Sequence, residues 1–161
     1  MDLTPIHPKV TPIYQTSVFK FSSLAELEEY YTAPDHAGRY GYSRSEHPNS
    51  DELVAEVAKL EGAVGGVATG AGLAGLLAAV LAVCQAGDHV LCPAELYGGS
   101  VVLLSNELTR LGIETSYVPL ADLYDLAKHR KPNTKLVLAE VLSNPLLVVL
   151  DGPRLAQACQ E

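Results

Sequence analysis

A glycine-rich turn, which joins a short β-branched segment to an apolar helix, is the feature that most constrains this chain. It reads Val67-Ala68-Thr69-Gly70-Ala71-Gly72-Leu73-Ala74-Gly75-Leu76-Leu77. Glycine lets a ligand approach the main chain closely, and the first amides of a helix have no partner within the helix. The helix dipole places partial positive charge at the same end. Such a turn predicts an anion site, most often for a phosphate group.

The bulk properties of the chain limit its class. The 161 residues are enough for about one domain, and 48% of them are hydrophobic, which favours a folded core. The net charge of -8 argues against a nucleic-acid-binding surface. The apolar stretch from Ala71 to Ala86 falls short of a bilayer span and predicts a buried helix instead. No secretory signal is apparent at the N-terminus.

The cysteines indicate a reducing compartment. Their number is odd, and no pair has the C-x-x-C spacing of a metal site or redox motif: Cys84, Cys92 and Cys159. We therefore expect reduced core thiols, a cytoplasmic location and no metal site. The histidines also lack the spacing of metal ligands.

The order of elements predicts the fold class. From Asn49 onward we expect helices at 50–60, from the glycine turn to 85, at 101–111, 120–128 and 152–159, and strands at 64–69, 89–92, 113–118 and 135–140. Strands that alternate with helices through short turns indicate an α/β fold with a mostly parallel sheet. The first 48 residues are rich in proline and tyrosine and hold one short helix at 23–31. We expect residues 1–48 to form an arm that contacts a partner subunit, and residues 49–161 to form a partial α/β domain.

The glycine turn alone leaves more than one function open. Gly70, Gly72 and Gly75 fit G-x-G-x-x-G after a predicted strand, and Glu95 follows the next strand. A small Rossmann-like dinucleotide-binding domain is therefore an alternative. Tight helix packing explains the stretch Ala74-Gly75-Leu76-Leu77 equally well.

Four further residues are candidates for ligand contacts. Tyr97 follows a predicted strand and can stack on a flat ring, although a loop tyrosine more often only packs. Asn144 follows another strand and precedes Pro145, where a simple turn residue is the plain interpretation. Tyr42 and Arg44 offer donors that suit a phosphate, but such a pair is more often part of a surface patch.

Eight segments in one order resemble a known family. These segments are Thr11–Ser17, Tyr42–Arg44, Leu60–Gly62, Ala68–Gly72, Gly87–Val90, Leu96–Gly99, Pro132–Val137 and Ser143–Leu146. They are similar to the N-terminal part of the pyridoxal-phosphate (PLP) enzymes of cysteine and methionine metabolism, which include cystathionine γ-synthase, cystathionine lyases, methionine γ-lyase and O-acetylhomoserine sulfhydrylase. The resemblance covers nearly the whole chain, which makes it more specific than the glycine pattern.

The resemblance implies a fold, a cofactor and roles for individual residues. The fold would be an incomplete large domain of the aspartate-aminotransferase-like PLP fold (fold type I). The amides of Gly72 and Leu73 would hold the phosphate of pyridoxal 5'-phosphate, and Tyr97 would stack on the pyridine ring. Asn144 would bond near the phenolic oxygen of that ring. Tyr42 and Arg44 would reach the phosphate of a neighbouring subunit, which implies a homo-oligomer or binding to an intact paralogue.

The implied reaction is β- or γ-elimination, or γ-replacement, on a sulfur amino acid or an O-acyl-homoserine. The chain departs from the family pattern, because Ala71 stands where a Ser is usual and Glu46 brings a negative charge near an anion site. None of its lysines has the context of the Schiff-base lysine: Lys9, Lys20, Lys59, Lys128, Lys131 and Lys135. We therefore expect a truncated member that is inactive alone, with the 64–69 strand lacking its neighbours. A non-catalytic remnant that binds an intact paralogue through its arm is a further alternative.

Overall fold

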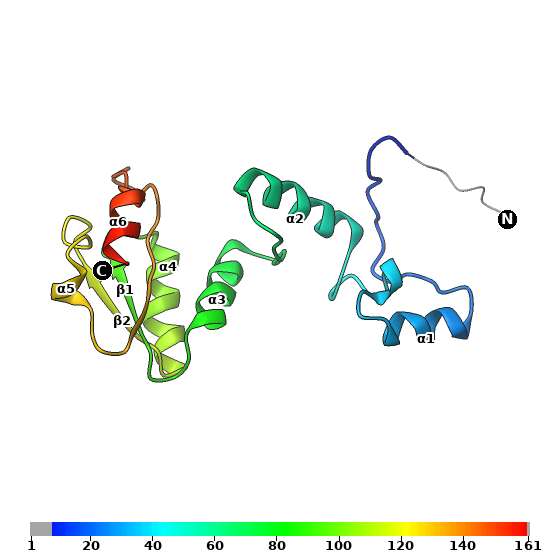
Figure 1. Cartoon of the computed structure of the whole chain (residues 1–161), viewed down its shortest axis with the longest axis horizontal. Coiled ribbons are helices and arrows are strands. Elements are labelled where there is room, and N and C mark those ends of the chain that lie inside the picture. The colour runs from blue at the N-terminus through cyan, green and yellow to red at the C-terminus, as the bar shows by residue number, and fades with distance from the viewer. Residues whose placement is uncertain (1–7, 161) are drawn as a thin grey trace. The chain divides into compact units, whose positions relative to one another are not determined.

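The computed structural model describes residues 8–160 (Figure 1). The chain divides into two compact units, Met1–Ala68 and Thr69–Glu161. Helix α2 (Pro48–Glu61) belongs to the first of these units by its contacts. The expected division into an arm at 1–48 and a partial domain at 49–161 concerns contacts with a partner subunit, and it stays a prediction.

The first unit holds the predicted short helix and a chain that folds back on itself. Helix α1 (Leu24–Thr32) begins at Ser23, whose hydroxyl accepts the amide of Glu26 at 3.1 Å. The 3₁₀ turn η1 (His36–Gly38) follows, and an antiparallel bridge joins Val18 to Tyr42. This bridge brings the segment before α1 beside the segment after η1.

The carboxylate of Glu46 lies inside this first unit. It accepts the hydroxyl of the buried Tyr30 and, at 2.9 Å, the amide of Gly41. Hydrogen bonding to the carboxylate and burial raise the pKa of Tyr30 to about 12. The charge of Glu46 therefore fixes α1 against the segment that leads to Tyr42 and Arg44.

Helix α2 matches its prediction, but the strand expected after it is absent. Gly62 ends the helix in the left-handed region at φ 63°, where glycine has no Cβ penalty. The prediction of a strand at 64–69 is wrong, because these residues pair with no strand among the described residues. Val64 and Val67 are 112% and 83% exposed, so the segment has neither a ladder partner nor a packed face.

The second unit is built on a three-stranded parallel sheet. Its strands are β1 (His89–Pro93), β2 (Glu114–Val118) and β3 (Thr134–Val137), in the order β2-β1-β3. Both pairings are parallel, with His89 opposite Glu114 and Thr134. Strand β1 is central and buried along its whole length. The expectation of a mostly parallel α/β sheet is confirmed.

Helices cover both faces of the sheet. They are α3 (Gly72–Val83), α4 (Gly98–Val102) with its π-helical continuation η2 (Leu103–Leu108), α5 (Leu126–His129) and α6 (Gly152–Ala158). Val90 and Cys92 pack with side chains of α3 and η2, whereas Leu91 packs with those of α5 and α6. This alternation along β1 gives the three layers of an α/β fold. No helix among residues 8–160 is long and apolar enough to cross a membrane.

Three local predictions need correction. The helix expected at 120–128 is only α5, because turns occupy the preceding residues: Asp122 donates its amide to Pro119, and Asp125 to Asp122. The helix expected at 101–111 begins at Gly98 and contains the wider turns of η2. Cys159 is exposed and not a core thiol, whereas Cys84 and Cys92 are buried.

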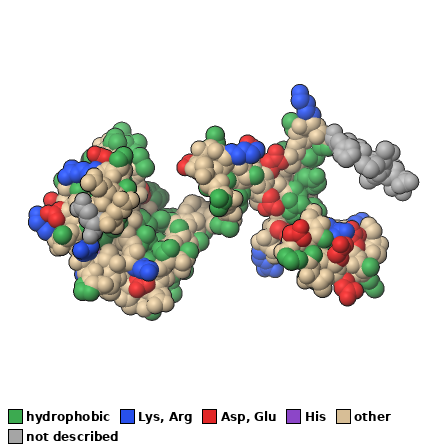
Figure 2. Space-filling view, in the orientation of Figure 1, with side chains coloured by type: hydrophobic (Ala, Val, Ile, Leu, Met, Phe, Trp, Pro, Cys, Tyr) green, Lys and Arg blue, Asp and Glu red, His purple; other side chains and the backbone are tan. Residues whose placement is uncertain are grey.

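Many apolar side chains remain at the surface of both units (Figure 2). Helix α3 carries no polar side chain, yet Leu81 and Val83 are 44% and 48% exposed. A helix that is apolar on all sides is typical of a buried position in a larger protein.

Candidate functional site

The N-terminus of α3 presents two backbone amides without acceptors. The carbonyl of Ala71 accepts the amides of Ala74 and Gly75, both at 3.1 Å, and the hydroxyl of Thr69 at 2.9 Å. No hydrogen bond within residues 8–160 uses the amide of Gly72 or Leu73. Ala71 is the N-cap residue and offers no side-chain acceptor to the helix. Two donors and the positive end of a twelve-residue helix therefore remain available to an anion.

The local geometry leaves room for a ligand at this turn. A Cβ added at Gly70 or Gly72 would meet no atom within 4 Å, so the main chain is open there. A Cβ at Gly75 would lie 3.2 Å from the hydroxyl oxygen of Thr69. Gly75 therefore has a packing role, which is the plain explanation for the third glycine of the motif. The amides of Gly72 and Leu73, free within residues 8–160, are donors that fit a phosphate group.

Tyr97 lies at the carboxyl end of the sheet, where parallel α/β folds bind ligands. It follows β1 by four residues and is the N-cap residue of α4. Its side chain is 51% exposed, so part of the ring is open to a ligand. A Cβ added at Gly99 would lie only 2.4 Å from a carbon of this ring. The ring thus folds back over the backbone of Gly99, a close approach that only glycine permits.

Glu140 connects Tyr97 to the end of β3. Both of its carboxylate oxygens lie 3.1 Å from the amide nitrogen of Tyr97, and one accepts the hydroxyl of Ser100 at 3.3 Å. The sequence pattern predicts Glu140 only as the last residue of the 135–140 strand. The sequence signal for its role is that it is the first acidic residue after an apolar strand. The carboxyl ends of parallel strands meet at one edge of the sheet, where ligands bind.

Asn144 lies four residues beyond Glu140 and is exposed. It precedes Pro145 through a cis peptide bond, and the neighbouring Ser143 is buried. Ser143 exchanges hydrogen bonds with Val148, with its amide donating to the carbonyl and its hydroxyl accepting the amide, both at 2.9 Å. Among the hydrogen bonds of the described residues, that of Glu140 joins Tyr97 to this segment, but none joins Gly72 or Leu73 to Tyr97 or Asn144.

Tyr42 and Arg44 lie in the first unit and contact each other. The guanidinium carbon of Arg44 is 5.0 Å from the centre of the Tyr42 ring, which is the geometry of a cation–π contact. Tyr42 is part of the Val18–Tyr42 bridge and Arg44 follows it, while Glu46 accepts the amide of the adjacent Gly41. The two side chains are thus held together, and their contact with the phosphate of a neighbouring subunit stays a prediction.

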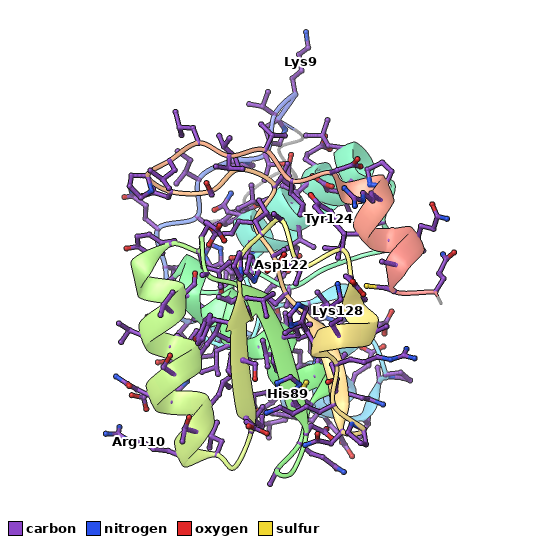
Figure 3. The ribbon with its side chains drawn as sticks, turned by 90° about the vertical axis from the view of Figure 1, so that its left-hand side faces the viewer. Lys9, His89, Arg110, Asp122, Tyr124 and Lys128 are labelled. Atoms are coloured by element: carbon purple, nitrogen blue, oxygen red, sulfur yellow. The ribbon has the colours of Figure 1, made fainter. Side chains whose placement is uncertain are left out.

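The opposite end of the sheet carries no predicted site residue. His89 lies there, at the amino end of β1, while Asp122 and Tyr124 lie towards the carboxyl ends (Figure 3). The His89 side chain is fully buried, with Nδ1 2.7 Å from the hydroxyl of Thr134. Burial lowers the pKa of this imidazole, which favours the neutral form.

The lysines lie in ion pairs or on the surface. Lys59 pairs with Glu56, Lys131 with Glu114 and Lys128 with Asp125. Lys135 is exposed at the amino end of β3, away from Tyr97 along the strand direction. Lys9 and Lys20 are exposed in the first unit. Within the described residues, no lysine is joined by a hydrogen bond or ion pair to Tyr97, Asn144 or the glycine turn.

Sequence comparison identifies the family. The sequence pattern of the family described as "Cys/Met metabolism PLP-dependent enzyme" matches residues 4–161. The chain is 43% identical over 140 residues to a cystathionine beta-lyase of Lactococcus lactis subsp. cremoris, which covers 87% of this chain and 34% of the relative. It is 36% identical over 140 residues to an L-methionine gamma-lyase of Fusobacterium nucleatum, covering 87% of this chain and 35% of that protein.

Structural comparison gives the same result. A crystal structure of a putative O-acetylhomoserine (thiol)-lyase from Campylobacter jejuni superposes with a TM-score of 0.78 at 31% identity. The match covers 93% of this chain and 36% of that one, which carries an N'-pyridoxyl-lysine-5'-monophosphate. The chain thus spans about a third of the length of the relatives it matches. These matches confirm the expected PLP fold type I and show that this chain belongs to the family of PLP-dependent enzymes of cysteine and methionine metabolism.

Proposed function

We propose that the second unit binds pyridoxal 5'-phosphate with the phosphate on the N-terminus of α3. The observation that carries this proposal is the pair of unpaired amides of Gly72 and Leu73 at an uncapped helix start. A phosphate dianion would accept both amides and gain from the helix dipole. The family to which the chain belongs is PLP-dependent, so the cofactor supplies the ligand that these donors fit.

We infer that Tyr97 and Asn144 hold the ring of the cofactor. The exposed ring of Tyr97 offers a flat apolar face, and the Asn144 amide offers a donor on the neighbouring loop. When bound, PLP supplies an electron sink that stabilises negative charge on an amino-acid substrate. The contribution of these residues is to fix the ring and the phosphate so that the cofactor keeps one orientation.

The names of the relatives indicate the substrate class. They are a cystathionine beta-lyase, an O-succinylhomoserine sulfhydrylase and an L-methionine gamma-lyase. Each name refers to an amino acid that carries sulfur or an acyloxy group in its side chain. We propose that this chain serves a trans-sulfuration reaction of the same kind, by elimination or replacement at Cβ or Cγ.

We further propose that the chain acts in an oligomer and does not complete the reaction by itself. Tyr42 and Arg44 would contact the phosphate bound to a neighbouring subunit, because their paired side chains present a hydroxyl and a guanidinium together. The partner would be another copy or an intact paralogue. The isolated 161-residue chain would lack turnover because no lysine among the described residues is linked to the proposed site.

The role of the α3 amides can be tested by replacing Gly72 with proline. Proline at the first helical position removes one N–H, and Ala71 already has the extended conformation (φ −158°, ψ 152°) that a following proline requires. Losing a hydrogen bond to a charged phosphate costs about 2 kcal/mol, or close to thirtyfold in Kd. We expect Gly72→Pro to weaken PLP binding by this factor in isothermal titration calorimetry.

Gly72→Ala is the matched control for this experiment. It keeps the N–H, and its Cβ would meet no atom within 4 Å, so its Kd for PLP should equal that of the parent chain. Pyridoxal, which lacks the phosphate, should bind both variants equally. Equal PLP affinity of Gly72→Pro and Gly72→Ala would contradict the proposed phosphate site.

The role of the Tyr97 ring can be tested at Gly99. A Cβ there would overlap the ring at 2.4 Å, so Gly99→Ala must displace the Tyr97 side chain. Loss of ring stacking should weaken PLP binding about fivefold, which corresponds to an aromatic pair. Gly98→Ala, where a Cβ meets nothing within 4 Å, should keep the parent Kd. If Gly99→Ala binds PLP as tightly as Gly98→Ala does, Tyr97 does not stack on the ring.

The proposed lack of turnover can be tested by borohydride reduction of the PLP-loaded chain. We expect no single lysine peptide to carry a stoichiometric pyridoxyl group, and no release of thiol or ammonia from cystathionine or methionine. Peptide mapping by mass spectrometry and an assay of both products give the result. Stoichiometric labelling of one lysine together with turnover would show that the chain is a working enzyme.

A further inference from the structure

Glu140 completes the start of helix α4 from a distant part of the chain. In a capping box, the third residue of a helix is Glu or Gln, and its side chain accepts the amide of the N-cap residue. Here the N-cap residue is Tyr97, and the third helical residue is Ser100, whose side chain is too short for this bond. Glu140 accepts the Tyr97 amide instead, at 3.1 Å, and also accepts the Ser100 hydroxyl at 3.3 Å.

This arrangement joins two adjacent strands at their carboxyl ends. Tyr97 follows β1 and Glu140 follows β3, and these strands are neighbours in the sheet. The two residues are 43 positions apart, so the bond does not depend on local chain geometry. A carboxylate at a helix N-terminus also interacts favourably with the helix dipole. Glu140 therefore fixes the backbone from which the Tyr97 ring projects.

Glu140 is also close in sequence to the other proposed ring contact. Asn144 follows it by four residues, and the intervening Ser143 is buried and tied to Val148 by two hydrogen bonds. The segment between Glu140 and Asn144 is thus anchored at both its beginning and its end. A shift of Glu140 would move the Tyr97 backbone relative to this segment.

We propose that Glu140 is a positioning residue for the cofactor ring, which sets the Tyr97 ring relative to the Asn144 loop. This inference rests on the proposed function, because it concerns the ring site of the same cofactor. Glu140 would touch neither cofactor nor substrate. It would act through the amide of Tyr97 and the hydroxyl of Ser100.

The test compares three variants of the 161-residue chain with PLP as the probe. Glu140→Ala removes the acceptor, and Glu140→Gln keeps one acceptor oxygen without the charge. Glu95→Gln is the matched control, because Glu95 accepts the amide of Leu120 at 2.9 Å, and no hydrogen bond among residues 8–160 joins it to Tyr97. For each protein, the Kd for PLP, the Kd for inorganic phosphate and the induced circular dichroism of bound PLP are measured.

We expect Glu140→Ala to weaken PLP binding about fivefold, as loss of ring stacking would, and to reduce the induced dichroism. Its affinity for inorganic phosphate should stay unchanged, because the α3 amides are intact. Glu140→Gln should show a smaller change in the same direction, and it keeps the proposal testable if the alanine variant does not fold. Glu95→Gln should leave the PLP affinity and the dichroism unchanged even if it lowers the melting temperature.

A second readout needs no cofactor. The amide proton of Tyr97 should exchange with solvent faster in Glu140→Ala than in the parent chain, as measured by hydrogen exchange, whereas Glu95→Gln should leave this rate unchanged. If the parent binds PLP and Glu140→Ala matches it in affinity and dichroism, the positioning role is overturned and the proposed function stands. If the parent shows no saturable PLP binding, the proposed function fails, and the positioning role fails with it.

Discussion

Two backbone amides at the uncapped start of helix α3 are the central feature of the proposed cofactor site. Helix α3 begins after Ala71, whose side chain cannot cap it. The Ala71 carbonyl accepts three hydrogen bonds, whereas the amides of Gly72 and Leu73 have no acceptor among the described residues. Helix starts normally satisfy such amides with a side chain, water or a ligand. An anion here would satisfy both amides and interact with the dipole of an apolar helix. The serine that is usual in the family at the position of Ala71 would add a hydroxyl donor. This chain therefore depends more on its main-chain amides to bind a phosphate.

The sheet places the second half of the proposed site. Because β1 and β3 are parallel neighbours, the residues that follow them meet at one edge, and Glu140 ties Tyr97 to that edge. The Tyr97 ring lies over Gly99, where a side chain would displace it. The first unit has a comparable internal support, in which Glu46 joins Tyr30 to Gly41 just before Tyr42. In both units an acidic side chain orders the backbone that carries a proposed contact residue.

The parts that could be predicted from the sequence are those set by local signals. Ser23, Gly62 and the apolar run after Gly72 mark α1, α2 and α3 by capping and periodicity, which act within a few residues. The 64–69 strand was predicted from its β-branched residues, but a strand forms only with a partner, and the described chain offers none. The π-helical turns of η2 begin just after Val101, whose carbonyl accepts the hydroxyl of Tyr117 from β2. This contact joins residues far apart in the sequence, so local signals do not predict it. The role of Glu140 is not predictable from the sequence for the same reason, since its partners lie 40 or more residues away.

The most direct test is a nuclear magnetic resonance titration of the ¹⁵N-labelled chain with pyridoxal 5'-phosphate. We expect the amide signals of Gly72 and Leu73 to shift saturably and further than any others, and the Tyr97 signal to shift with the same Kd. Pyridoxal, which lacks the phosphate, should leave the Gly72 and Leu73 signals unmoved. Saturable binding that shifts other amide signals while those of Gly72 and Leu73 stay in place would show that the phosphate does not bind at the start of α3.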